Sequence, residues 1–516
     1  MVCSLAAISN VFLLIGWSLI FPNAAQGQTP FGQIGIRLSI PNTFMNNASA
    51  EAAMGPSVEI AKTIPAASSS QGRTYYVSPH GKDSNPGTLN SPWASPGFAS
   101  RRLKPGDTLM IMGGRYVLSQ FDEDILSPPS GTSKAWITIK GKEGNRPILA
   151  GQENLATAII LSGVHYVRIE NLEITHNEKT TGEGIYFREG IQILEKPASH
   201  LVLKDLYIHH LDEFGLNFQD VKDLKIINCR IEYCGFGAIG GPAREKGGWQ
   251  NILIQGCKLS YSGHYYQGGD GSKRPYDRPD GFGIEASAGP IKIIDTFAAH
   301  NFGDGLDSKA ENTLILRSVA ANNSCDGIKL WGDRSRIENS LIYGRGDGNT
   351  EKTPWAAIVL HTEKRNARFE IIHVTVDDIL GGNYLMHVQY DQQDLPITLT
   401  LRNNIFRGAG PNCPIFIGHA TNLKVENNLF YFPQSDTVFV HGEKEFSAET
   451  IKNLGKGNIY GDPLFISPAW GKEGNYHVKS RSPAVNAGGH MSSVSDDLEK
   501  KARDNQPDMG AYELGL

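Results

Sequence analysis

Cysteine is scarce in this sequence, and the few cysteines follow no metal-binding or disulfide pattern. The 516 residues include six cysteines, none of them in a Cys-x-x-Cys pair. This excludes the common zinc motifs, and the irregular spacing argues against a disulfide framework. We expect Cys229, Cys234 and Cys257 to pack in the cores of neighbouring repeats, with a disulfide between two of them as the alternative.

The sequence also lacks an excess of charge of either sign. Its formal net charge is -5, with 20% charged and 40% hydrophobic residues, which is ordinary for a soluble protein with a sizeable core. Neither a nucleic-acid partner nor a polybasic membrane contact is expected from this balance. An anionic substrate would need a local basic patch instead.

Long hydrophobic runs are absent as well. The apolar stretch at residues 11–21 is too short for a membrane span and is followed by Pro22-Asn-Ala-Ala-Gln-Gly. We interpret residues 1–27 as a secretory signal peptide that carries Cys3 away, with an uncleaved anchor as the alternative. The mature protein would then be secreted, extracellular or periplasmic, without stable membrane association. Residues 28–72 are rich in Ala, Ser, Asn and Pro and predict a low-complexity leader, with a strand pair over the N-terminal end of the coil as the alternative.

The sequence does contain a repeat. Short apolar segments recur, each broken by Asn, Asp, Gly, Ser or His at the point where the chain would bend into a second sheet. Such units bury their apolar sides only against their neighbours, so they predict one solenoid. The predicted fold is all-β, a right-handed parallel β-helix of about ten or more coils with capping elements at both ends. The segments are residues 167–174, 201–208, 224–231, 252–259, 291–298, 314–321, 335–342, 369–376, 399–406 and 423–430.

The boundaries of the solenoid follow from these repeats. We expect the β-helix to span residues 73–460. Residues 461–516 would form a capping segment over its C-terminal end, because an open coil exposes core and unpaired backbone. Inward-facing Asn residues at the bends would form a hydrogen-bonded ladder from coil to coil. We expect a monomer.

One phrase occurs three times in the middle of the chain. The copies are Asp280-Gly-Phe-Gly-Ile-Glu-Ala, Asp304-Gly-Leu-Asp-Ser-Lys-Ala and Asp326-Gly-Ile-Lys-Leu-Trp-Gly, at intervals of 24 and 22 residues. Each interval is one coil, so equivalent positions would stack about 4.8 Å apart, and side chains would alternate between the interior and the outer face. The stacking predicts one column of Asp280, Asp304 and Asp326 beside a second, outward-facing column of Gly283, Asp307 and Lys329.

Asp-Gly alone is ordinary turn chemistry, which every coil needs. Turn chemistry does not require charge in the middle of a strand, however, as at Asp307 and Lys329. Carboxylates stacked this closely repel one another unless a cation lies among them. An oxygen-binding cation such as Ca²⁺ meets that need, with Lys329 one coil away.

The interval between residues 258 and 291 is longer than a coil requires. Its aromatic and basic residues, immediately before Asp280, predict a wall of a sugar-binding groove, since solenoids place binding surfaces on long loops of one face. A solvated loop without function is the alternative. The residues are Tyr261, His264, Tyr265, Tyr266, Lys273, Arg274, Tyr276 and Arg278, and the interval also contains the acidic Asp270.

These motifs carry a resemblance to known families. The Tyr75-Tyr-Val-Ser-Pro start, the coil repeats and the closing Pro507-Asp-Met-Gly-Ala-Tyr-Glu resemble secreted bacterial β-helix proteins, which include lyases, hydrolases and epimerases. Asp280-Gly-Phe, Asp304-Gly-Leu-Asp and Asp326-Gly-Ile-Lys-Leu resemble the pectate lyases of polysaccharide lyase family 9. The resemblance implies that Asp280, Asp304 and Asp307 are calcium ligands and that Lys329 is the catalytic base. Gly303 departs from the family, which has an Asp there; the metal site would be weaker, use another oxygen, or be inactive.

The chemistry of a uronate lyase fits these residues. The enzyme removes the C5 proton beside a carboxylate and expels the oxygen at C4, and a bound Ca²⁺ would acidify that proton. A lysine base must be neutral, so the pKa of Lys329 would have to fall, which predicts an alkaline optimum. The partner would be an anionic polysaccharide, with pectate as the first candidate. The candidate substrate-binding residues are Lys309, Trp331, Arg278, Arg334 and His361, although Lys309 could instead pair with Glu285.

Two other functions remain open. A glycoside hydrolase would need two carboxylates flanking the bond, such as Asp304 and Asp307, but would leave Lys329 unexplained. A non-catalytic carbohydrate-binding protein could use the same aspartates for structural calcium. The role of Lys329 distinguishes both from a lyase.

Overall fold

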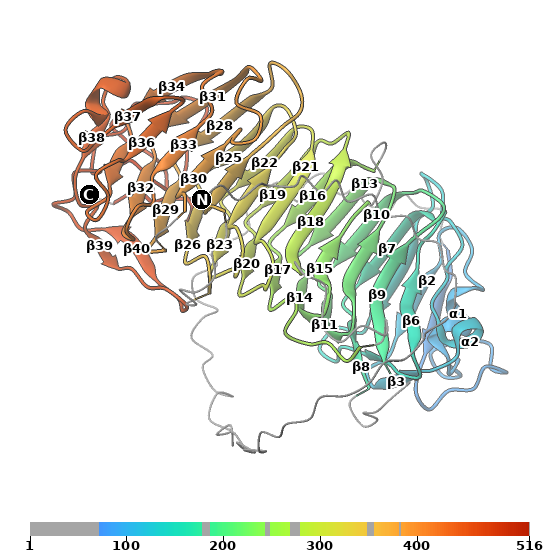
Figure 1. The fold of residues 1–516 in the computed structure, drawn as a ribbon. Helices are drawn as coiled ribbons and strands as arrows, with labels where there is room; N and C mark the ends of the chain where they lie inside the picture. The colour runs from blue at the N-terminus through green and yellow to red at the C-terminus, as the bar shows by residue number, and fades with distance from the viewer. Residues whose placement is uncertain are drawn as a thin grey trace, which may run out of the picture. The chain divides into compact units, whose positions relative to one another are not determined.

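A computed structural model describes residues 72–177, 186–242, 248–268, 279–347, 355–380 and 383–514. The predicted signal peptide and leader lie outside these residues, apart from Gly72. Within them, each coil adds one strand to each of three long sheets, and successive coils follow one another along the stack (Figure 1). The predicted right-handed parallel β-helix is confirmed.

The first sheet has 13 parallel strands among the described residues. They are β1 (Thr74–Val77), β2 (Thr108–Ile111), β4 (Ile137–Gly141), β7 (His165–Glu170), β10 (Ala198–Lys204), β13 (Val221–Ile227), β16 (Trp249–Gln255), β19 (Ile291–Ile294), β22 (Thr313–Leu316), β25 (Ser335–Glu338), β28 (Arg368–Ile372), β31 (Ile397–Arg402) and β34 (Thr421–Glu426).

The second sheet follows the first around each coil. It consists of β3 (Arg115–Leu118), β5 (Ile148–Gly151), β8 (Glu173–His176), β11 (Tyr207–Leu211), β14 (Arg230–Cys234), β17 (Lys258–Ser260), β20 (Phe297–Ala299), β23 (Val319–Ala321), β26 (Leu341–Tyr343), β29 (Thr375–Asp378), β32 (Ile405–Gly408), β35 (Leu429–Tyr431) and β38 (Ile459–Tyr460).

The third sheet carries the repeated Asp-Gly phrase. It consists of β6 (Leu155–Ile160), β9 (Phe187–Ile193), β12 (Phe214–Phe218), β15 (Gly237–Gly240), β18 (Asp280–Ser287), β21 (Leu306–Ala310), β24 (Ile328–Leu330), β27 (Ile358–Leu360), β30 (Met386–Val388), β33 (Ile415–Ile417), β36 (Phe439–His441) and the antiparallel β37 (Lys444–Phe446). Outside the three sheets lie α1 (Pro96–Ser100), α2 (Phe121–Asp124), the 3-10 helix η3 (Ile451–Leu454), and the antiparallel pair β39 (Phe465–Ser467) and β40 (Asn475–Val478).

The bends between the first and second sheets use residues that tolerate a left-handed backbone. Asn171, Asp205 and Asn228 have φ values of 53°, 54° and 51°, a region that Asn and Asp adopt more readily than other residues with a side chain. The following residues point inward. There Asn404 Nδ2 donates to Asn428 Oδ1 at 2.9 Å, and Asn428 Nδ2 donates to Asn458 Oδ1 at 3.0 Å. The predicted asparagine ladder is therefore present in the last coils.

The cysteines pack as predicted. Cys229, Cys234 and Cys257 are buried and free, and they contribute to the core that runs through the stacked coils. Among the described residues, no helix is long and apolar enough to cross a membrane.

The segment after residue 461 contacts the second sheet. Its described part packs against the outer face of the second sheet: Arg503 Nη2 donates to Asn339 Oδ1 at 2.9 Å, and the Ala511 backbone N–H donates to Thr375 Oγ1 at 2.9 Å. Met509 and Tyr476 join a second core there with outward-facing residues such as Ala321. Small outward residues on these strands leave room for that segment on this side of the solenoid. That residues 461–516 cap the open end stays a prediction.

Candidate active site

Three neighbouring strands of the third sheet, β18, β21 and β24, bring the charged residues together. Gly283, Asp307 and Lys329 stand opposite one another in the strand register. Phe282, Leu306 and Ile328, each the residue before, are fully buried in the coil interior. The alternation predicted from a period of two is confirmed, and it turns Asp307 and Lys329 to the outer face.

The aspartates that open the three phrases connect one coil to the next. The Asp304 N–H donates to Asp280 Oδ1 at 2.6 Å, and the Asp326 N–H donates to Asp304 Oδ1 at 2.9 Å. The Ala356 N–H donates to Asp326 Oδ1 at 3.0 Å. Each carboxylate thereby uses one oxygen for the scaffold, which fixes its position and leaves the second oxygen for the outer face.

A cluster of three carboxylates and one ammonium results. Oxygen atoms of Asp280, Asp304 and Asp307 lie within 4.8 Å of one another. Lys329 Nζ lies 2.7 Å from Asp304 Oδ2 and 3.0 Å from Asp307 Oδ2. Asp304, Asp307 and Lys329 are buried, whereas Asp280 is partly exposed.

The electrostatics of the cluster follow from burial and like charge. Burial, together with the neighbouring carboxylates of Asp304 and Asp307, raises the pKa of Asp280 well above its ordinary value. Burial also raises the pKa of Asp307, although Lys329 opposes this. Too much negative charge is therefore concentrated here for one ammonium to neutralise.

The pKa of Lys329 differs from the sequence-based expectation. Burial lowers this pKa, but the surrounding carboxylates raise it by more, and it lies well above its ordinary value. The carboxylates are those of Asp307, Asp304, Asp326 and Asp280. Among the described residues of the cluster, Lys329 is the counter-ion of the aspartates. The expected fall in its pKa requires another positive charge to take over that role.

The residues fit a hard divalent cation. All the candidate ligand atoms are carboxylate oxygens, which Ca²⁺ prefers. Asp307 Oδ1 is buried and has no hydrogen-bond partner. A Cβ at position 283 would lie 2.6 Å from Asp280 Oδ2, so that Gly283 leaves space beside this carboxylate. An unpaired carboxylate oxygen such as Asp307 Oδ1, next to the space left by Gly283, is a suitable environment for a cation.

Asp326 has a different environment from the other three aspartates. It lies outside the group whose oxygens converge, and burial together with Asp304 raises its pKa to about 7. Its hydrogen bond to the Ala356 N–H gives it a place in the scaffold. The predicted column of three aspartates thus supplies two residues to the cluster, and Asp307 from the second column completes it.

The candidate substrate contacts divide into three groups. Lys309 forms an ion pair with Glu285, and its Nζ lies 5.2 Å from the centroid of the Trp331 ring. The Trp331 and His361 rings lie 4.5 Å apart, so these three side chains form a row beside Lys329. Arg334 is held instead by Asp333 at 2.7 Å and by the Asn312 side chain at 2.7 Å, at the turn after β24. Arg278 lies outside the described residues.

The predicted groove wall is described only in part. Asp270, Lys273, Arg274 and Tyr276 lie outside the described residues. Tyr261 stacks between Tyr233 and His300, with ring centroids 4.7 Å and 5.3 Å away. This stack belongs to the edge of the second sheet, and the interpretation as a groove wall stays a prediction.

Sequence reasoning missed one acidic residue of the same face. Glu189 precedes Ile191 by two residues, as Asp280 precedes Phe282, and the register links Ile191 to Phe282 through Leu216 and Ile239. Glu189 is therefore in the column of Asp280, three strands away. The signal was present, because Glu189-Gly-Ile repeats the acid-Gly-apolar order of Asp280-Gly-Phe.

Burial is the main influence on the pKa of the Glu189 carboxyl. Its exposed fraction is 3%, Asn217 Nδ2 donates to Oε1 at 2.7 Å, and Oε2 has no hydrogen-bond partner. Burial raises its pKa to about 8, against an ordinary value of 4.5. The folded protein therefore holds a proton on this carboxyl at neutral pH, when the unfolded chain does not.

We expect Glu189→Gln to remove a pH dependence of stability. Because the folded-state pKa is raised, the native state binds the proton more tightly, and stability falls as the pH rises from about 4.5 to about 8. The amide cannot ionise, so the variant should gain stability over the wild type as the pH rises through this window. Thermal unfolding of both proteins at pH values below and above it measures the effect. Equal pH slopes for the two proteins would contradict the assignment.

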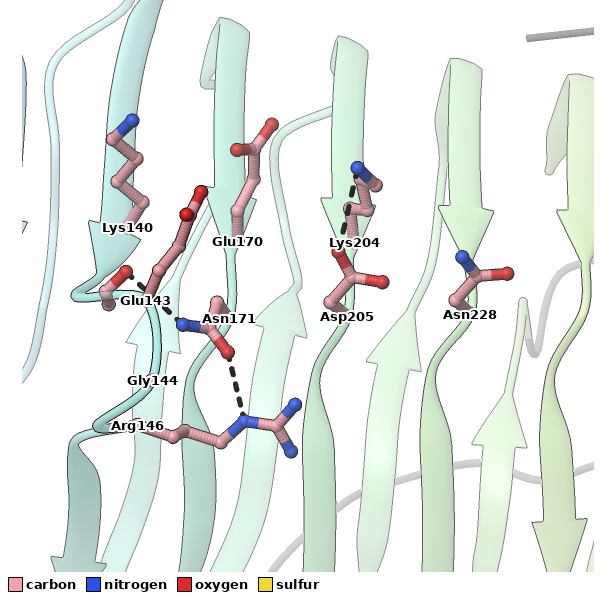
Figure 2. A pocket seen from close by; sticks show the side chains of 10 residues that line it. Lys140, Glu143, Gly144, Arg146, Glu170, Asn171, Lys204, Asp205 and Asn228 are labelled. Carbon is pink, nitrogen blue, oxygen red and sulfur yellow. Dashed lines mark hydrogen bonds and ion pairs between the residues drawn. The ribbon is translucent and has the colours of Figure 1, made fainter. Parts of the chain in front are cut away.

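A hollow lies away from this cluster. It has a volume of about 410 Å³ and lies at the bend between the first and second sheets (Figure 2). Its charges are of both signs, and two of its cations have partners within the hollow: Arg146 Nε donates to Asn171 Oδ1 at 3.0 Å, and Lys204 pairs with Asp205 at 3.5 Å. Without a convergent, unsatisfied group, the hollow is not a candidate for the chemistry.

The fold and the cluster together define a class of protein: a parallel β-helix that presents acidic residues and a lysine on one outer sheet. The family described as "Pel9A-like, right handed beta helix region" matches residues 75–350, and the chain belongs to this family. The match includes β18, β21 and β24, the strands of the cluster. It also identifies the fold as similar to that of pectate lyases.

Individual relatives are more distant. The chain is 25% identical over 285 residues to the pectate disaccharide-lyase of Dickeya chrysanthemi, covering 53% of this chain and 30% of that protein. It is 31% identical over 143 residues to the uncharacterized protein YwoF of Bacillus subtilis (strain 168), covering 26% and 28%. Less than a third of either relative is spanned. The structure of XylC with xylose has a TM-score of 0.55 at 11% identity, covering 86% of this chain and 98% of that one, which concerns the fold alone.

Proposed function

We propose that this protein is a polysaccharide lyase that cleaves a uronate polymer by calcium-assisted β-elimination, with Lys329 as the base. The observation that carries the proposal is the position of Lys329, whose Nζ lies 2.7 Å and 3.0 Å from two of three convergent carboxylates. A structural cation site has no need of a lysine among its ligands. Membership of a pectate-lyase-like family and the likeness to a pectate disaccharide-lyase support the proposal.

The three aspartates and Lys329 would have different roles in the reaction. Asp280, Asp304 and Asp307 would hold Ca²⁺, which when bound would neutralise the substrate carboxylate and make the C5 proton more acidic. With a divalent cation held by these aspartates, the ammonium would no longer be their counter-ion, and the pKa of Lys329 would fall. Neutral Lys329 would then accept the C5 proton, the C4–O bond would break as the C4–C5 double bond forms, and the departing oxygen would take a proton from water. A high working pH favours the neutral base.

The row beside Lys329 supports binding of a sugar. The Trp331 ring is partly exposed, and its Nε1 has no hydrogen-bond partner among the described residues. Lys309 lies next to this ring and offers a positive charge to an anionic polymer. These contacts would orient the substrate rather than take part in bond breaking.

The separation of the Asp304 and Asp307 carboxylates does not favour a glycoside hydrolase. Hydrolases hold two carboxyl groups about 5–5.5 Å or about 6.5–9.5 Å apart, with the bond between them. Here oxygen atoms of Asp304 and Asp307 lie within 4.8 Å of one another and share one ammonium, which is closer than either separation. A structural calcium site is the remaining alternative.

The proposal is tested by ultraviolet absorbance, because elimination creates a conjugated double bond that the substrate lacks. A panel of uronate polymers, with pectate first, is incubated at alkaline pH with calcium or with a chelator. We expect absorbance to rise on one polymer and only with calcium. Release of reducing ends without absorbance would replace the lyase with a hydrolase, and no reaction in either assay would leave only a binding role.

Gly303 provides a gain-of-function prediction. It precedes Asp304, at the position where the related lyases have a further aspartate. We expect Gly303→Asp to raise calcium affinity about tenfold, because calcium affinity increases with the number of charged oxygen ligands. Calorimetric titration of wild type and variant with calcium measures the change. Unchanged or weaker binding would mean that position 303 does not face the cation.

A further inference from the structure

A second cluster of side chains lies on the third sheet, beyond the Asp–Lys cluster. It consists of five rings, those of Trp355, Tyr384, His387, Tyr390 and Phe416, and we call it the aromatic platform. The His387 centroid lies 5.6 Å from Tyr384, 5.1 Å from Tyr390 and 5.7 Å from Trp355. Phe416 lies 5.2 Å from Tyr390 and 5.4 Å from Tyr384. The rings therefore form one contiguous surface.

The aromatic platform and Lys329 lie at equivalent positions of neighbouring strands in the third sheet. In the register, Lys329 is opposite Val359, Val359 is opposite His387, and His387 is opposite Phe416. Two strand spacings of about 4.8 Å each place His387 on the order of 10 Å from Lys329 along the sheet. Val359 between them is apolar. A short stretch of polysaccharide lying along the third sheet would reach both.

Two exposed aromatic rings and a buried histidine without hydrogen-bond partners indicate that the platform binds a ligand. Trp355 and Tyr390 are 43% and 41% exposed, among the most exposed large hydrophobic residues of the described chain. His387 is only 7% exposed, and neither of its ring nitrogens has a hydrogen-bond partner among the described residues. Burial lowers the pKa of His387 to about 4, so the ring is neutral and offers one donor and one acceptor. Buried polar groups are normally paired, and exposed aromatic groups mark binding sites.

We propose that the aromatic platform binds a sugar ring of the same uronate chain whose cleavage we assign to Lys329. The inference rests on the proposed function and adds a subsite to it. The apolar C–H face of a pyranose would pack on the exposed Tyr390 and Trp355 rings, beside the unpaired polar atoms of His387. An apolar surface with a few convergent polar groups is the composition of a small-ligand site.

The subsite predicts a dependence on chain length. We expect Trp355→Ala and Tyr390→Ala each to weaken binding of a hexagalacturonate about tenfold, because each variant loses one aromatic contact with the sugar. Binding of the disaccharide should be unchanged. Tyr390→Phe keeps the ring and should bind as the wild type does. Binding is measured by calorimetry with calcium in the Lys329→Ala background, where the oligosaccharide is not consumed.

The control is Phe121→Ala, which removes a ring that is 54% exposed on α2, outside the third sheet. Equal hexasaccharide affinity in the platform variants and this control would overturn the inference, even if the wild-type protein makes unsaturated product. A protein that makes no such product but shows the length-dependent loss would keep the subsite and refute the lyase. Self-association that the platform variants abolish, without an effect on sugar binding, would assign the surface to a second copy of the chain.

Discussion

Replacement of Lys329 by alanine is expected to lower turnover by about 10³-fold or more, because positioned proton transfer contributes up to about 10⁴-fold and this residue is the proposed base. The same change removes the ammonium that pairs with Asp304 and Asp307 at 2.7 Å and 3.0 Å. Removing one partner of a buried ion pair costs about 3–5 kcal/mol. The variant should therefore be less stable than the wild type without calcium and should regain most of that stability when calcium is added.

Steady-state kinetics and thermal unfolding with and without calcium measure the two effects. Lys309→Ala is the matched control, since Lys309 lies one strand from Lys329 on the same face and pairs with the exposed Glu285. That variant should change KM more than kcat. Turnover of Lys329→Ala within tenfold of the wild type would exclude the residue as the base, whatever its effect on stability.

Asp307→Asn is expected to weaken calcium binding about 10²-fold and to make activity depend on added calcium. The carboxylate has one oxygen on Lys329 and one buried oxygen without a partner. The substitution removes the negative charge and replaces one of these oxygens by an NH2 group, which cannot bind a cation. Calcium affinity depends on the charge of its ligands. Activity measured over a range of calcium concentrations should show a shifted midpoint with a recoverable maximum.

Asp326→Asn serves as the comparison for Asp307→Asn. It keeps the oxygen that accepts from the Ala356 N–H at 3.0 Å, and this residue lies outside the converging group. Its calcium affinity should change much less. An equal loss in both variants would mean that general negative charge, rather than a defined ligand set, holds the cation.

Much of the fold and of the Asp–Lys cluster could be predicted from the sequence, because the coil repeat and the alternation of side chains along a strand act together. Repeats of one coil length stack equivalent residues, and the strand period of two separates inward from outward side chains. Asp307 and Lys329 could therefore be placed together on the outer face before any coordinates were known. The inward asparagines and the buried cysteines follow from the same two periods.

Other features depend on contacts that periodicity does not describe. The pKa of Lys329 is set by the balance between burial and four carboxylates, whose relative strength needs the actual distances. Tyr384 and Tyr390 flank β30 without a repeated spacing, so nothing in the sequence brought them together with Trp355. The segment after residue 461 is not periodic, and its position against the second sheet depends on the small residues there.

The most direct test of the lyase assignment is the mass balance of a single cleavage. A defined oligouronate is digested in the presence of calcium, and both products are weighed by mass spectrometry. Elimination predicts that the two product masses add up to the mass of the substrate, with one product unsaturated. Products that together exceed the substrate by one water molecule would contradict the account and establish hydrolysis instead.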